Sequence, residues 1–170
     1  FSTFNYIGGT EGKWSYTAYY QKRVGQGWRE NGYFNTDHAH VEVSYAATNK
    51  LKLGLEATYM TTESQQPGGL TDQLFNQDAR QSIRGRNWFS TPWFVPSFSA
   101  QYIVSPATKL EWKVFGTIAE RNSIGYMRPI NQEDDLGNRQ VDRDYYTTYG
   151  SELRMTTDHK LFGIDNTLAT

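Results

Sequence analysis

The feature that most constrains the fold is the spacing between segments of alternating apolar and polar residues. These segments are about ten residues long, and the gaps between them are by turns short and long. Only Thr48 and Asn49 separate 38–47 from 50–62, whereas the next gap extends to about Trp93. A period of two is typical of half-buried β-strands. Tight turns at one end of a sheet and long loops at the other are typical of outer-membrane β-barrels.

The pattern predicts an all-β fold, an antiparallel up-and-down transmembrane β-barrel. We expect about eight strands, at 1–8, 12–23, 38–47, 50–62, 95–105, 109–121, 144–156 and 160–169. The long loops are expected on the extracellular side, at about 24–37, 62–94 and 122–143.

The composition fits this architecture. Only 37% of residues are hydrophobic, yet 15% are aromatic, as expected for a barrel with a wet lumen and aromatic residues at its rims. No run approaches the roughly 18 apolar residues of a transmembrane helix. The chain has no cysteine, and its net charge of −1 provides no basic field for nucleic acid. We therefore expect no nucleic-acid partner.

Register follows from keeping the apolar side chains on one face. The pairs expected across three hairpins are Tyr6 with Trp14, Val43 with Leu53, and Tyr102 with Trp112. The residues expected to face lipid are Ala39, Val41, Val43, Leu53, Leu55, Tyr102, Trp112 and Val114. Those expected to face the lumen are Glu42, Glu56, Glu111 and Lys113, which are too polar for a dry core.

Two other architectures stay open at this point. A complete eight-stranded outer-membrane barrel would serve as an adhesin or structural anchor, and its first strand would pair with its last. A soluble ligand-binding β-barrel would show the same period-two alternation. The loop asymmetry and the aromatic content favour a membrane barrel over the soluble one.

The second long loop combines a predicted helix with a basic, aromatic segment. Thr71 is expected to cap a short helix that ends near Asp78. After it come five candidate ligand-binding residues, which are Arg80, Arg84, Arg86, Asn87 and Trp88. Guanidinium groups bind carboxylate and phosphate oxygens in a bidentate manner. Arg84 and Arg86 lie two apart, so an extended backbone would place both on one face, where we expect them to bind one anionic ligand together.

The third long loop adds Arg121 and Arg128 to the candidate ligand-binding set. The alternative role for these arginines is pairing with acidic loop residues or with lipopolysaccharide phosphates. The acidic run 133–135 lacks the pattern of a calcium loop, and we expect a solvated turn there. His38 and His40 are expected to line the lumen. No catalytic motif occurs, so we predict neither an enzyme nor a bound metal or cofactor.

Several motifs together resemble the barrel of TonB-dependent outer-membrane receptors, in particular the ferric-dicitrate branch. They are spread in order over nearly the whole chain, as GWREN (27–31), SQQPGGLTD (64–72), RQSIRGRNWF (80–89), ERNSIG (120–125) and SELR (151–154).

The resemblance implies a cell outer-membrane receptor that imports a ferric chelate, such as ferric citrate or another siderophore-like anion. Such receptors combine a plug domain with a 22-stranded barrel and draw energy from an inner-membrane complex through the plug. Residues 1–170 are then expected to be a partial barrel domain of about eight consecutive strands, without plug. The partners implied are the chelate, outer-membrane lipid, lipopolysaccharide and the energy-coupling complex.

Overall fold

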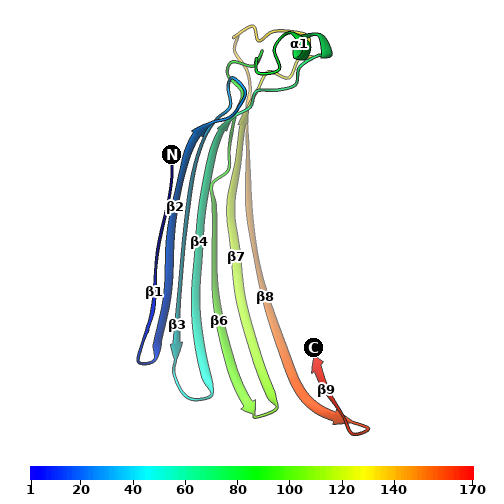
Figure 1. The fold of residues 1–170 in the computed structure, drawn as a ribbon. Coiled ribbons are helices and arrows are strands. Elements are labelled where there is room, and N and C mark those ends of the chain that lie inside the picture. Colours follow the sequence, from blue (N-terminus) through cyan, green and yellow to red (C-terminus); the bar gives the residue numbers. More distant parts are fainter.

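The computed structural model covers all 170 residues and consists of one long, curved sheet with loops gathered at one end (Figure 1). The strands are β1 (Ser2–Glu11), β2 (Trp14–Gln26), β3 (Tyr33–Ala46), β4 (Leu51–Gln65), β5 (Trp88–Ser90), β6 (Trp93–Ser105), β7 (Thr108–Ile124), β8 (Val141–Leu161) and β9 (Ile164–Ala169). A single helix, α1 (Asp72–Gln77), lies in the loop between β4 and β5. No helix is long and apolar enough to cross a membrane.

Strands that follow one another along the chain pair with one another, and every pair is antiparallel. The one exception is that β5 and β6 together occupy a single position between β4 and β7. The predicted all-β, up-and-down antiparallel fold is therefore confirmed.

The interruption between β5 and β6 falls at Thr91 and Pro92. Proline has no N–H to donate to a ladder, which is why it breaks central strands. The chain nevertheless keeps its place, because the Thr91 N–H donates to the Thr62 carbonyl at 3.0 Å and the Glu120 N–H donates to the Pro92 carbonyl at 2.9 Å. The expected strand 95–105 therefore begins at Trp93, and β5 extends the same sheet position into the predicted loop 62–94.

The sheet is open. β1 pairs only with β2, and β9 pairs only with β8. A complete eight-stranded barrel, whether in a membrane or in water, would join its first strand to its last. The observed pairing therefore does not support either of the two closed-barrel alternatives.

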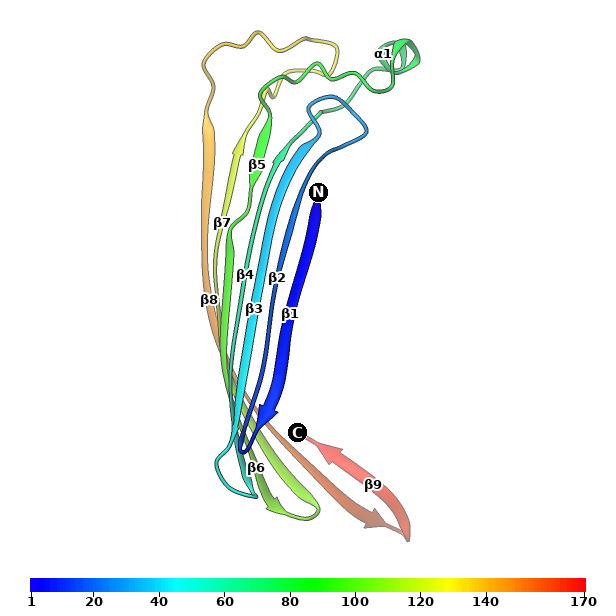
Figure 2. The same ribbon diagram turned by 60° about the vertical axis from the view of Figure 1, so that its left-hand side comes forward.

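Short and long connections are segregated at opposite ends of the sheet (Figures 1 and 2). The short ones span 12–13, 47–50, 106–107 and 162–163, and the long ones span 27–32, 66–87 and 125–140. The first long loop is shorter than the predicted 24–37, because β2 and β3 continue pairing up to Gln26 and Tyr33. Backbone hydrogen bonds hold this extension, and they do not require apolar alternation.

Two predicted hairpins are wrong at the turn. The first turns at Gly12, whose φ of 57° suits a two-residue hairpin, so Tyr6 pairs with Tyr19 and not with Trp14. That shift is odd, so it moves Phe4 and Tyr6 to the polar face. The last hairpin turns at Phe162–Gly163, with φ values of 54° and 80°, and not at 158–159.

The two middle hairpins are shifted by two residues. Val43 pairs with Leu55, and Tyr102 pairs with Leu110. An even shift keeps every side chain on its face, so the predicted division into an apolar and a polar face is confirmed. On the polar face, Glu56 accepts hydrogen bonds from Ser97 Oγ at 3.1 Å and Lys113 Nζ at 3.4 Å.

The sheet is a single layer, so the chain has almost no core of its own. Ala119 is the only buried hydrophobic residue, and only Ser44 and Arg84 are buried besides it. Large apolar side chains such as Leu55 and Leu153 are mostly exposed. An exposed apolar face of this extent indicates that something outside this chain covers it.

Candidate functional site

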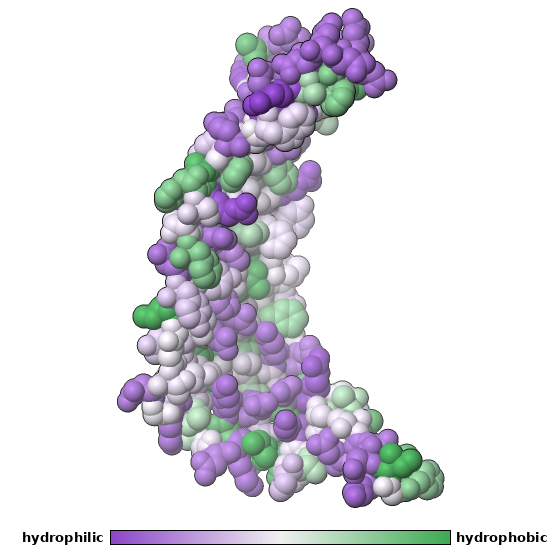
Figure 3. All heavy atoms as spheres, viewed as in Figure 1, coloured by the Kyte–Doolittle hydropathy of each residue, from purple (hydrophilic) through white to green (hydrophobic).

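Three long loops meet at one end of the sheet and form what we call the loop cluster, which comprises 27–32, 66–87 and 125–140 (Figures 1 and 2). Hydrophilic residues cover most of this end of the molecule (Figure 3). All seven candidate ligand-binding residues lie in the loop cluster or in the strands directly below it.

Helix α1 forms where the sequence predicts a cap. Thr71 has an extended backbone, and its Oγ1 accepts a hydrogen bond from the Leu74 N–H at 3.2 Å. Asp72 lies in the first turn, where a negative charge interacts favourably with the helix dipole. The helix has only six residues, and Asp78 ends it as expected.

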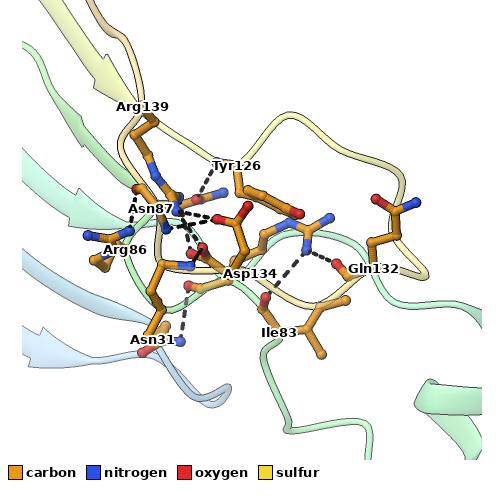
Figure 4. Close-up of polar contacts among 12 residues, drawn as sticks. Asn31, Ile83, Arg86, Asn87, Tyr126, Gln132, Asp134 and Arg139 are labelled. Carbon is orange, nitrogen blue, oxygen red and sulfur yellow. Dashed lines mark hydrogen bonds and ion pairs between the residues drawn. The ribbon is translucent and has the colours of Figure 1, made fainter.

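Arg84 is the central residue of the loop cluster. It is only 3% exposed, and its guanidinium donates to the carbonyl oxygens of Gln132 at 2.6 Å, Arg128 at 2.9 Å, Pro129 at 3.0 Å and Ile83 at 3.3 Å (Figure 4). Burying a charged group is costly unless its donors are satisfied, and here backbone carbonyls satisfy them. Arg84 therefore ties the second long loop to the third.

This geometry differs from the expectation that Arg84 and Arg86 grip one solute together. The Arg84 side chain is directed into the protein, whereas Arg86 is exposed and donates to the Gly137 carbonyl at 2.7 Å. The backbone between them is irregular, so the two-residue spacing of an extended strand does not apply. Gly68 contributes to this arrangement: its φ is 71°, and a Cβ there would lie 2.6 Å from Arg84 Cγ.

Tyr126 lies beside two guanidinium groups. The Arg84 and Arg139 guanidinium carbons are 5.0 and 5.4 Å from its ring centroid, within range of a cation–π interaction. The Tyr126 N–H donates to Asn87 Oδ1 at 2.8 Å. The ring and its backbone thus connect both arginines to the end of the second loop (Figure 4).

Asp134 and Arg139 form the most buried ion pair, with side chains 3% and 9% exposed. Both terminal nitrogens of Arg139 contact the carboxylate, and the Leu136 N–H donates to it at 2.8 Å. The hydrogen bonds from Arg139 have the largest effect on the pKa of Asp134, and together with the Leu136 N–H they hold it below its usual range. The same carboxylate raises the pKa of Arg139. Two residues of the acidic run, Asp134 and, at 3.8 Å, Asp135, therefore contact an arginine, so the expected solvated turn is wrong for Asp134, whereas Glu133 is exposed. No three His, Asp or Glu side chains of the chain are placed to hold a metal ion together.

The first long loop is fastened to the second. Arg29 donates to the carbonyl oxygens of Gly68 at 2.7 Å and Gln81 at 2.8 Å. Asn31, whose φ is 51°, donates from Nδ2 to the Arg84 carbonyl at 3.1 Å. All three loops therefore form one hydrogen-bonded unit, in which loop 66–87 contacts both of the others.

Three of the candidate arginines are exposed and less constrained. Arg121 lies 3.4 Å from Asp144 and 5.6 Å from the Phe89 ring centroid. Arg80 and Arg128 are exposed, and their side chains form no hydrogen bond or ion pair within the chain. Arg128 uses only its backbone carbonyl, which accepts from Arg84.

A half-open cavity of about 610 Å³ lies between the top of the sheet and loop 125–140. Three of the seven candidates, Asn87, Trp88 and Arg128, line it. The other lining residues are Gln66, Phe89, Ser123, Ile124, Gly125, Tyr126, Met127, Asp135, Asn138, Arg139, Gln140 and Asp142. Its volume is within the range of small-molecule sites.

Several residues that organise the site were missed by sequence reasoning. Arg29 and Asn31 attracted notice only as part of a resemblance motif, and Tyr126 and Arg139 were not singled out. The signal available was weak: Asp134 and Arg139 stand five apart in an irregular loop, where no periodicity predicts contact. Their roles depend on loop conformation, which the local sequence does not specify.

Comparison with known proteins supports the fold. No family model and no curated protein matches the chain. A solved structure, that of the ferric citrate transporter FecA in the unliganded form, matches with a TM-score of 0.82 and 21% sequence identity. The match covers 96% of this chain and 24% of that one, so the chain spans about a quarter of the length of the transporter. At this identity the likeness shows that the chain adopts the antiparallel fold of a segment of that transporter.

Proposed function

We propose that the chain is part of the barrel of an outer-membrane, TonB-dependent transport receptor that imports a ferric chelate. The observation that carries the proposal is a band on the apolar face that contains no charged residue. The likeness to a ferric citrate transporter supports the same class of solute.

The band, which we call the charge-free band, is defined by rows of paired residues from β2 to β8. Its lowest full row is Trp14, Tyr45, Leu53, Ala100, Trp112 and Leu153; the next is Tyr16, Val43, Leu55, Phe98, Val114 and Ser151. Above them lie Ala18, Val41, Ala57, Pro96, Gly116 and Tyr149, and then Tyr20, Ala39, Tyr59, Phe94, Ile118 and Thr147.

Charged residues begin directly above the band. The next row contains Lys22 and Asp37, which form an ion pair at 2.7 Å, and Glu120. On β4 the apolar alternation runs from Leu51 to Tyr59, about the nine to eleven residues of a tilted transmembrane strand. Tyrosine and tryptophan are frequent in the outermost rows, as in the aromatic girdles of outer-membrane barrels. This face is therefore suited to contact with the hydrocarbon chains of a lipid bilayer.

The polar face would then line the lumen, and the loop cluster would lie at the extracellular entrance. A ferric chelate with negative charge would meet Arg121 and Arg128, whose guanidinium groups are exposed on this side. Asn87 and Trp88 would contact the solute in the cavity, which Arg128 also lines and which Arg80, Arg86 and Arg121 do not line. Energy would come from an inner-membrane complex that acts through a plug domain outside this chain.

The test is uptake of ⁵⁵Fe-citrate by cells that carry the full-length receptor as their only route for the chelate. Replacing Arg121 and Arg128 by Gln should lower uptake by more than tenfold, because each charged hydrogen bond contributes about 1.5–3 kcal/mol. Replacing Arg80 by Gln is the matched control. Uptake in cells without the inner-membrane complex should be absent. Unchanged uptake in either case would contradict the proposal.

A further inference from the structure

The cavity beneath loop 125–140 has no net positive charge. Its lining contains two cations, Arg128 and Arg139, and two anions, Asp135 and Asp142. Arg139 is further compensated by Asp134, which holds both of its terminal nitrogens. An anion that entered would lose hydration without gaining an excess of positive charge. The cavity therefore favours a neutral occupant.

Besides these two pairs of opposite charges, the lining contains four neutral amide side chains. Gln66, Asn87, Asn138 and Gln140 all contribute to it. Asn87 accepts from the Tyr126 N–H through Oδ1, which leaves Nδ2 without a partner, and Asn138 forms no side-chain hydrogen bond. An amide both donates and accepts, so its natural complement is a group that does the same.

One further donor at this wall has no partner. The side chain of Arg139 is nine-tenths buried, and its Nε–H forms no hydrogen bond. A buried unsatisfied donor costs free energy, and because this nitrogen is itself inaccessible, an acceptor would recover that cost only if the guanidinium turned toward the cavity. This need for acceptors adds to that of the free amide nitrogen of Asn87.

We propose that this cavity binds the neutral, hydroxyl- or amide-bearing part of a small solute. The inference deepens the proposed function, on which it rests for the class of solute, since it names the chemistry that the outer cavity recognises. It concerns a different part of the solute from the negative charge that Arg121, outside the lining, would meet; Arg128 belongs to the lining, where Asp135 and Asp142 offset the two arginines. Polar groups that alternate donors and acceptors, as hydroxyls and secondary amides do, would reproduce the hydrogen bonds that water makes in such a site.

The experiment uses the purified full-length receptor in detergent and isothermal titration calorimetry. The probes are N,N′-diacetylchitobiose, which carries hydroxyls and amides, trehalose, which carries hydroxyls only, and citrate as the anion. In an Arg121→Gln protein, which lacks the anion contact outside the cavity, we expect the first to bind more tightly than citrate at low salt. Comparable binding of trehalose would assign the recognition to hydroxyls, and its absence would assign it to amides.

Two variants locate the binding. Asn138→Leu should weaken diacetylchitobiose by about five- to tenfold, the effect of losing one neutral hydrogen bond. Asn131→Leu, an exposed amide in the same loop that does not line the cavity, should have no effect. Asp142→Asn removes one negative charge and should increase the affinity for citrate.

Tighter binding of citrate than of both sugars by the Arg121→Gln protein would overturn the inference, and so would an absence of sugar binding at millimolar concentration. Equal effects of the two Leu variants would also overturn it. Because the measurement is made in detergent, its failure is distinct from a failure of iron uptake: sugar binding with no uptake would refute only the proposed function.

Discussion

The sheet and the loop cluster are held together by different kinds of hydrogen bond. In the sheet, backbone groups pair along regular ladders, which account for most of the 87 backbone hydrogen bonds within helices and strands. In the loop cluster, a few side chains donate to backbone carbonyls, and Arg84 alone makes four such bonds. In the sheet, the effect of a substitution therefore depends on whether the side chain lies on the apolar or the polar face. The conformation of the loop cluster depends on individual side chains such as that of Arg84.

The largest expected effect tests whether the two ends of the molecule lie on opposite sides of a membrane. Cysteine at Met127 in the loop cluster should react with an impermeant maleimide on whole cells, and cysteine at Phe162 in the last tight turn should not. Both side chains are more than 90% exposed, at 93% and 95%, so intrinsic accessibility is matched. Labelling at 162 alone would reverse the orientation of the sheet.

The second prediction tests the face dependence of the sheet. Val43→Arg should lower the free energy of unfolding of the full-length protein in a bilayer by about 2–4 kcal/mol, because it places a charge in the charge-free band. Its neighbour Glu42 lies on the polar face, and Glu42→Arg should have a far smaller effect. Urea titration of both variants measures the difference, and equal costs would contradict the division of faces.

The third prediction tests the dependence of the loop cluster on one residue. Arg84→Met should increase amide exchange in 125–140 by roughly 30-fold or more, since about 2–3 kcal/mol is lost when buried carbonyls lose their donor. Exchange in the strands should not change. Arg80→Met, which removes an exposed side chain, is the control. If both variants behaved alike, Arg84 would not hold the loops together.

The smallest expected effect is a pH dependence confined to the loop cluster. The pKa of Asp134 is lowered by Arg139, so the stabilisation is complete above about pH 4 and is lost as the pH falls through the folded-state pKa. A fluorophore attached to cysteine at Met127 should report loop opening below that pH. Asp134→Asn should abolish this pH dependence, and its persistence would point to another group.

The difference between the two regions also explains what the sequence predicts. The alternation around Val43 and Leu55 defines the faces, because a period of two survives an error of two residues in register. In the first hairpin, the predicted partner of Tyr6 differs from the observed one by an odd number of residues. Gly8, Gly9 and Gly12 all favour a turn, and only the folded hairpin shows that the turn is at Gly12. The role of Arg84 could not be predicted, because three of its four partners lie more than forty residues away and all four are backbone carbonyls.

Gly68 limits the substitutions that the loop cluster can accept. Any side chain at this position would occupy the space that Arg84 fills, and its positive φ disfavours other residues. Substitution at Gly68 alone should therefore be poorly tolerated, yet it should do less harm after Arg84 has been replaced by a smaller residue. A change at Gly68 is therefore expected to require a change at Arg84. A variant of this chain with new loops should exchange 66–87 and 125–140 as one block.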